Sequence, residues 1–93
     1  MLEEYLRYLQ YEKNYSSRTV SSYRKDINQF TAYYSRINNS TDISKAEVDD
    51  IRLWIAELIS VNKITSRSVC RKLSSMKSFY KFLLKKNIID SSP

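Results

Sequence analysis

The sequence contains no glycine and no histidine, and it has one cysteine and one proline among its 93 residues. Without glycine, Gly-rich phosphate-binding loops are excluded and tight β-hairpins are disfavoured. Without histidine, the commonest general base and metal ligand is missing. The single cysteine, Cys70, cannot form an internal disulfide, which favours a reducing compartment. We therefore expect no catalytic residues, no metal and no cofactor in this sequence.

Long apolar runs are also missing. No segment approaches the roughly 20 apolar residues that cross a bilayer, and the acidic start Met1-Leu2-Glu3-Glu4 is unlike a signal peptide. We expect a cytoplasmic protein with no membrane partner. Hydrophobic residues make up 42% of the sequence and charged residues 28%, which is typical of a globular protein, and the length suits one domain.

Apolar residues recur at spacings of three and four, which is the period of an α-helix. We expect helices at about residues 1–13, 17–37, 45–61 and 66–86. The short connections between them predict an all-α fold, a four-helix bundle of two antiparallel helical hairpins. The four expected apolar faces consist of Leu2, Tyr5, Leu6 and Leu9; Val20, Tyr23, Ile27, Phe30 and Tyr34; Val48, Ile51, Ile55 and Leu58; and Val69, Leu73, Met76, Tyr80 and Leu83.

Local signals mark the helix ends. Ser16 and Thr65 are expected to cap the second and fourth helices, and Ser44-Lys45-Ala46-Glu47 has the pattern of a capping box for the third. Because glycine is absent, asparagine is the next residue able to close a helix in the left-handed conformation. The candidates for this role are Asn38 or Asn39, Asn62 and Asn87.

Charge is distributed unevenly around the net value of +6. Residues 16–40 carry four basic groups and one acidic group, and residues 63–93 carry eight and one. Residues 41–62 are acidic, with two basic groups and five acidic groups. This segregation predicts a basic face that the second and fourth helices build together, as a polyanionic partner requires.

The second and fourth helices begin alike, with Ser16-Ser17-Arg18-Thr19-Val20 and Thr65-Ser66-Arg67-Ser68-Val69. Each start places an arginine in the first helical turn, where the helix dipole already provides partial positive charge. A phosphate at the helix end would make both features favourable, because arginine and free N–H groups would contact the same anion. The repeated pattern therefore predicts an anionic partner.

The outward sides of these helices mix arginine with small hydroxyl residues, a composition suited to close approach to a nucleic-acid backbone or base edge. We expect Arg18, Arg67 and Arg71 to form one surface, free of internal carboxylates. By helical geometry the outward residues are Arg18, Ser21, Ser22, Lys25, Asn28 and Gln29 in the second helix, and Arg67, Arg71, Ser74, Ser75, Ser78 and Lys85 in the fourth, with Ser68 and Lys72 at the margin.

Two runs, Tyr15–Ile27 followed by Phe30 and Ser68–Leu83, resemble the second and fourth helices of the core-binding domains of Xer-like tyrosine recombinases and phage-type integrases. The segment from Ile43 to Leu58 is similar to the third helix of that family, and Asn87 to Pro93 is similar to its exit linker. The resemblance implies a SAM-like core-binding domain over residues 1–87. Residues 88–93 would then begin a linker to a catalytic domain.

The resemblance further implies that the domain binds double-stranded DNA and clamps one side of a recombination site, with other recombinase protomers as partners in a synaptic tetramer. The family's catalytic Arg, Lys, His and nucleophilic Tyr would belong to a second domain outside these residues, so that strand cleavage and rejoining would be activities of the parent protein. Carried over by position, the implied DNA contacts are Arg18, Thr19, Ser22, Arg67, Ser68, Arg71 and Ser75, to which the outward geometry adds Lys25 and Ser78.

Two other functions fit less well. A helical protein-interaction module is the main alternative, in which the acidic segment from Asp42 to Glu57 would meet a partner and an exposed Trp54 would be expected. A helix-turn-helix repressor is a weaker alternative, because the basic charge is divided between two helices instead of one recognition helix.

Overall fold

In the computed structural model, which describes residues 2–93, four α-helices and one short 3-10 helix are formed and no β-strand is present in those residues. The predicted all-α, four-helix class is confirmed. The start expected at residue 1 lies outside the described residues. Among residues 2–93, none of the helices has the length and hydropathy of a membrane-spanning segment. The elements are α1 (Leu2–Tyr11), α2 (Ser17–Asn38), η1 (Ile43–Lys45), α3 (Val48–Ser60) and α4 (Ser66–Lys85).

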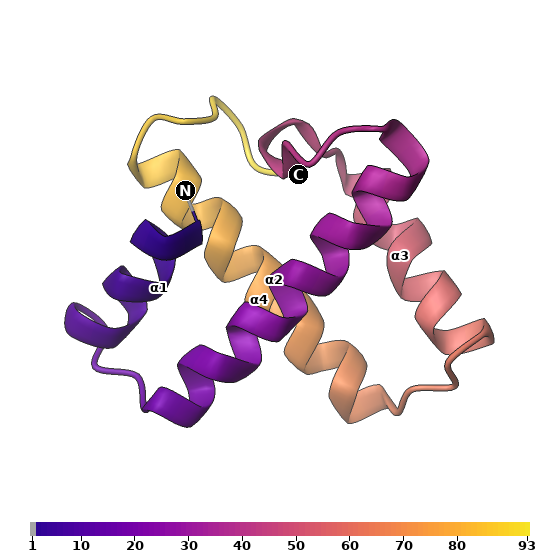
Figure 1. Cartoon of the computed structure of the whole chain (residues 1–93), viewed down its shortest axis with the longest axis horizontal. Coiled ribbons are helices and arrows are strands. Elements are labelled where there is room, and N and C mark those ends of the chain that lie inside the picture. The colour runs from indigo at the N-terminus through magenta and orange to yellow at the C-terminus, as the bar shows by residue number, and fades with distance from the viewer. Residues whose placement is uncertain (1) are drawn as a thin grey trace.

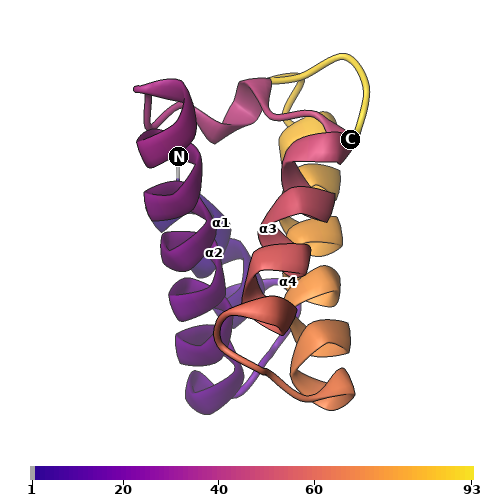
Figure 2. The ribbon, with the colours of Figure 1, turned by 90° about the vertical axis from the view of Figure 1, so that its right-hand side faces the viewer.

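The two longest helices, α2 and α4, cross at the centre of the molecule, with α1 on one side of the crossing and α3 on the other (Figure 1). Figure 2 shows α2 and α4 in two separate layers. Both helices begin at the same end of the molecule, the lower edge in Figures 1 and 2. At the opposite end, the Tyr80 hydroxyl of α4 donates a hydrogen bond of 2.6 Å to the Ile43 carbonyl of η1. The crossing therefore leaves the two helix starts on one edge.

The apolar faces close on a single core that is rich in aromatic rings. The ring of Phe30 from α2 packs edge-on against Trp54 of α3, with ring centres 5.2 Å apart, and Tyr5 of α1 packs in the same way against Phe79 of α4. Two expected core residues are misplaced, because Val48 and Leu73 are exposed. Val48 is the first residue of α3. In α4 the buried face includes Lys72 in place of Leu73.

The expected N-caps of α2 and α4 are confirmed, since the hydroxyls of Ser16 and Thr65 each accept a hydrogen bond from the backbone N–H three residues later. The capping box expected to start at Ser44 is wrong. Ser44 lies inside η1, so α3 begins later and is capped by Glu47. Glu47 forms a box with Asp50, whose carboxylate accepts the Glu47 N–H at 2.8 Å.

Four residues other than glycine have positive φ within residues 2–93. Asn39 (φ 55°) follows α2 and Asn87 (φ 59°) follows α4, as predicted. After α3, which ends at Ser60, the left-handed residue is Lys63 (φ 52°) and not Asn62, because the Asn62 N–H still donates a helical hydrogen bond to the Leu58 carbonyl. Asn14 (φ 55°) has the same conformation after α1. In the absence of glycine, three asparagines and one lysine adopt the backbone conformation that reverses the chain.

Candidate nucleic-acid interface

The connections that lead into α2 and α4 have the same local structure. Each contains a left-handed residue that is followed by a backbone hydrogen bond to a carbonyl six residues earlier. The Tyr15 N–H donates to the Leu9 carbonyl at 3.0 Å, and the Ile64 N–H donates to the Leu58 carbonyl at 3.4 Å. The similarity of the two sequences therefore corresponds to a similarity of structure, and both helices start from equivalent turns.

The first turns of α2 and α4 have the same capping hydrogen bonds. The hydroxyls of Ser16 and Thr65 accept the N–H groups of Thr19 and Ser68, both at 3.2 Å. The other N–H groups at the start of an α-helix have no partner within the helix and carry its partial positive charge. Two such ends lie on the same edge of the molecule (Figure 1).

An arginine stands at each of these ends. Arg18 and Arg67 are exposed, and neither forms an ion pair with a carboxylate in the chain from residue 2 to residue 93. Seven of the nine predicted contact residues belong to the N-terminal halves of α2 and α4 and are exposed or half-buried, namely Arg18, Thr19, Ser22, Lys25, Arg67, Ser68 and Arg71.

Arg71 differs from the expectation, because it is bound to an internal carboxylate. Its Nε donates to Asp26 Oδ2 at 3.3 Å and its Nη2 donates to Asp26 Oδ1 at 3.0 Å. The prediction that Arg71 would be free of internal carboxylates is wrong. The Arg71 side chain is nevertheless 48% exposed, so this arginine lies at the surface although it contacts a buried carboxylate.

Ser75 and Lys72 also contact Asp26, and both are buried. The expected outward position of Ser75 is wrong, since its side chain is inside the bundle and its hydroxyl donates to Asp26 Oδ2 at 2.8 Å. The Lys72 ammonium donates to Asp26 Oδ1 at 2.9 Å and to Gln29 Oε1 at 2.6 Å. Asp26 itself is fully buried on α2, and a buried carboxylate needs several donors to offset its lost hydration. These donors turn α4 so that Lys72, and not Leu73, faces the interior.

The Asp26 cluster, which we define as Asp26, Arg71, Lys72 and Ser75, lies where α2 and α4 cross. Asp26 and Ser75 each stand nine residues after the first residue of their helix, so the two helices meet at equivalent positions. Burial raises the pKa of Asp26, but the hydrogen bonds from Lys72, Arg71 and Ser75 outweigh it and hold that pKa below its ordinary value. Asp26 is therefore ionised at neutral pH, and the cluster carries one negative and two positive side chains.

One acidic residue on the apolar face of α2 is a sequence signal for this cluster, and the spacing of apolar residues alone does not reveal it. Asp26 lies between Tyr23 and Phe30 at the spacing of the apolar face of α2, and directly before the buried Ile27. A carboxylate at a core-facing position implies partners on a neighbouring helix.

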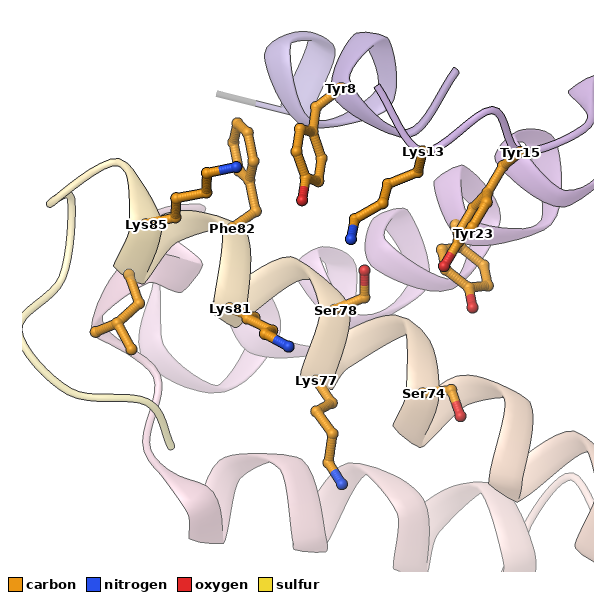
Figure 3. A pocket seen from close by; sticks show the side chains of 11 residues that line it. Tyr8, Lys13, Tyr15, Tyr23, Ser74, Lys77, Ser78, Lys81, Phe82 and Lys85 are labelled. Atoms are coloured by element: carbon orange, nitrogen blue, oxygen red, sulfur yellow. The ribbon is translucent and has the colours of Figure 1, made fainter. Parts of the chain in front are cut away.

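Ser78, the ninth predicted contact, lies away from the helix starts. It accepts a hydrogen bond of 2.9 Å from the Tyr5 hydroxyl and faces a groove of about 710 Å³ between α4 and the end of α1 (Figure 3). None of the four lysines of the groove forms an ion pair within the described chain. The groove is lined by Tyr8, Lys13, Tyr15, Tyr23, Ser74, Lys77, Ser78, Lys81, Phe82, Leu84 and Lys85.

The feature expected for a protein-interaction module is not found at Trp54. This side chain is only 2% exposed, so Trp54 gives no support to the protein-interaction alternative. Its ring packs on Phe30 and lies 5.9 Å from the ammonium of Lys72, which links α3 to the Asp26 cluster. Residues 2–93 contain no group of three His, Cys, Asp or Glu side chains placed to hold a metal ion.

Comparison with known proteins places these features in context. Residues 2–87 match the family described as phage integrase, N-terminal SAM-like domain. The chain is similar to the tyrosine recombinase XerC of Anoxybacillus flavithermus, with 40% identity over 92 residues, which cover 99% of this chain and 30% of that protein. It is also similar to the XerC of Leptospira interrogans serogroup Icterohaemorrhagiae serovar copenhageni, with 37% identity over 98% of this chain and 29% of that protein. The XerC of Bacillus subtilis is 32% identical over 96% of this chain and 29% of that protein. The chain spans less than a third of the length of these relatives, and no solved structure matches it.

Proposed function

This chain belongs to the family of phage integrase N-terminal SAM-like domains, and from that premise we propose that it binds double-stranded DNA through the N-terminal halves of α2 and α4. The observation that carries the proposal is the pair of equivalent helix starts on one edge of the molecule (Figure 1). Each start has N–H groups without a partner in the helix, small hydroxyl side chains, and an arginine that forms no ion pair within residues 2–93. Phosphate groups suit all three features.

The chemistry of these residues divides them by role. Arg18, Arg67 and Lys25 are exposed cations that contact phosphate oxygens. Thr19, Ser22 and Ser68 are small enough to let the DNA backbone approach the helices closely. Ser75 has no direct contact with DNA in this proposal, because it is buried, and Ser78 belongs to the groove beside α1.

We also infer that the parent protein is a tyrosine recombinase in which this domain clamps one side of the recombination site. Strand cleavage and rejoining would then be carried out by residues outside this chain, which has no histidine. The relatives are three to four times longer than the matched segment, as this division of labour requires. Other protomers bound to the same DNA would be the protein partners, and the acidic segment from Asp42 to Glu57 is the surface that we assign to them.

The test is the binding of the 93-residue chain to a labelled duplex of about 30 base pairs, followed by fluorescence anisotropy at about 50 to 200 mM salt. We expect weak binding, with Kd on the order of 10⁻⁶ to 10⁻⁴ M, that falls steeply as salt is raised, because phosphate contacts release counterions. The double variant Arg18→Gln/Arg67→Gln should bind about tenfold more weakly per arginine at the lowest salt, and the slope of log K against log salt should decrease by about 2.

The matched control is Lys45→Gln/Arg52→Gln, which removes the same charge from η1 and α3. This variant should keep the salt slope of the original chain. Equal losses in the two double variants would mean that net charge and not the helix starts determines binding. Self-association that does not respond to salt, without affinity for the duplex, would decide for the protein-interaction alternative.

A further inference from the structure

We infer that Arg71 is the base-reading residue of this domain, held by Asp26 so that the free edge of its guanidinium faces a guanine in the major groove. The inference rests on the proposed DNA-binding function and assigns different roles to arginines that look alike in sequence. Arg71 is fixed to a buried carboxylate by two hydrogen bonds of 3.0 and 3.3 Å, whereas Arg18 and Arg67 have no carboxylate partner among residues 2–93.

The geometry leaves the correct donors available. Nε and one N–H of Nη2 are directed at Asp26, so the two N–H groups of Nη1 and the second N–H of Nη2 remain. One N–H of Nη1 and one of Nη2 lie side by side at the end of the guanidinium. This pair matches the O6 and N7 acceptors of guanine, the commonest specific contact of arginine with DNA. With 48% of its side chain exposed, Arg71 can offer that end to a ligand.

The support beneath Arg71 is rigid because Asp26 is itself immobilised. Its carboxylate is fully buried and receives the Ser75 hydroxyl at 2.8 Å and the Lys72 ammonium at 2.9 Å. The Lys72 ammonium in turn donates to Gln29 Oε1 and lies over the Trp54 ring. An arginine positioned by such a cluster loses little side-chain entropy on binding, and a base contact depends on position far more than a phosphate contact does.

The cluster also keeps the surface positive. Lys72 compensates the charge of Asp26 from inside the bundle, so Arg71 adds a positive charge at the surface although it touches a carboxylate. Asp26 is thus a positioning residue that acts through Arg71, and Arg71 is the residue that touches the base.

The test uses two effects of Asp26 on DNA binding that have opposite signs. Its negative charge weakens binding to any duplex, whereas its contact with Arg71 strengthens binding to the preferred duplex. A library of randomised duplexes is bound to the 93-residue chain and sequenced, and the affinities for the enriched duplex and for a scrambled duplex of the same composition are compared. Asp26→Asn removes a negative charge near the DNA, so simple electrostatics predicts tighter binding to both duplexes. If Asp26 positions Arg71, the ratio of the two affinities should instead fall roughly tenfold or more, while binding to the scrambled duplex stays equal or increases.

Because Asp26→Asn leaves Lys72 buried without its carboxylate and can prevent folding, Arg71→Lys is the second variant. It keeps the surface charge and leaves the buried contacts of Asp26 with Lys72 and Ser75 in place, but an ammonium cannot make the paired contact with guanine. We expect the same loss of the affinity ratio with an unchanged salt slope. In the Arg71→Lys background, Asp26→Asn should have no further effect on the ratio.

Arg67→Gln is the control for a phosphate contact, and it should weaken both duplexes equally. A retained ratio in Arg71→Lys, or an enriched library without guanine preference, would overturn the assignment of Arg71 and leave the proposed DNA binding intact. If the original chain binds neither duplex, the proposed function itself fails. The two failures are therefore distinguishable.

Discussion

The starts of α2 and α4 are nearly identical, but the second turns of the two helices differ in chemistry. Arg18 and Arg67 occupy the same helical position, as do Ser16 and Thr65 at the caps. One turn later, α2 has Ser22 where α4 has Arg71, and at the crossing α2 has Asp26 where α4 has Ser75. The helix starts are repeated, whereas at the crossing one helix supplies the acceptor and the other supplies the donors.

Equivalent positions in the two helices therefore have different roles. Two carboxylates at the crossing would repel each other, and two serines would leave Lys72 buried without a counter-charge. An unlike pair resolves both problems, because Asp26 accepts hydrogen bonds from every donor that α4 presents there. In the proposed function the repeated starts form one extended surface for DNA, and the unlike crossing fixes how the two halves of that surface are oriented.

The largest expected effect on stability comes from removing either the acceptor, Asp26, or the donor, Ser75, where α2 and α4 cross. Asp26→Ala should lower the free energy of unfolding by about 3–5 kcal/mol, because it leaves the Lys72 ammonium buried without its carboxylate. Ser75→Ala removes one hydrogen bond to a charged group and should cost about 1.5–3 kcal/mol. Urea unfolding of both variants measures the difference. Equal costs would show that the acceptor and the donor contribute alike.

Acid should remove part of the same stabilisation. The pKa of Asp26 is lower in the folded chain than in the unfolded chain, so its contribution is complete above the unfolded pKa of about 4 and is lost as the pH falls toward the folded pKa. Urea unfolding at about pH 7, 5 and 3 should therefore show a loss confined to the most acidic condition. Asp26→Asn should flatten this dependence. An unchanged acid dependence in that variant would assign the loss to other carboxylates.

A smaller effect tests whether the two starts are equivalent. Ser16→Ala and Thr65→Ala should each lower the free energy of unfolding by about 1 kcal/mol, because each removes a hydroxyl that accepts the N–H of the third helical residue at the same distance. Thermal and urea unfolding of the two variants should agree within error. A variant without any loss would mean that the cap at that helix is dispensable and that the two starts differ in stability.

The smallest expected effect on stability distinguishes the connection before α2, which contains Asn14, from the connection before α4, which contains Lys63. Lys63 holds a left-handed conformation that disfavours residues with a Cβ atom, whereas asparagine at position 14 tolerates it better. Lys63→Gly should raise the free energy of unfolding by up to about 1 kcal/mol, and Asn14→Gly should change it by no more than a few tenths. A destabilised Lys63→Gly variant would show that the lysine side chain contributes contacts that outweigh its backbone strain.

Much of the fold and part of the candidate site could be predicted from sequence, because their signals are local. The spacing of Val20, Ile27 and Phe30 identified the buried face of α2, and Ser16 and Thr65 identified the starts of α2 and α4. The start of α3 was misplaced because a 3-10 turn precedes it. Helix geometry alone placed Ser75 outside and Lys72 at the margin, since it takes no account of what a neighbouring helix offers.

Local sequence signals are enough to predict four helices, the same capped, arginine-bearing first turn in α2 and α4, and the net positive charge of these two helices. These properties depend on residues within a few positions of each other, whose backbone and capping interactions are short-ranged. The packing of the helices determines that Arg71 is bound to Asp26, that Arg18 and Arg67 form no ion pair within residues 2–93, and that Ser75 is buried. The physical reason is that a carboxylate 45 residues away along the chain must be satisfied once it leaves water, and which donors reach it depends on how the helices cross.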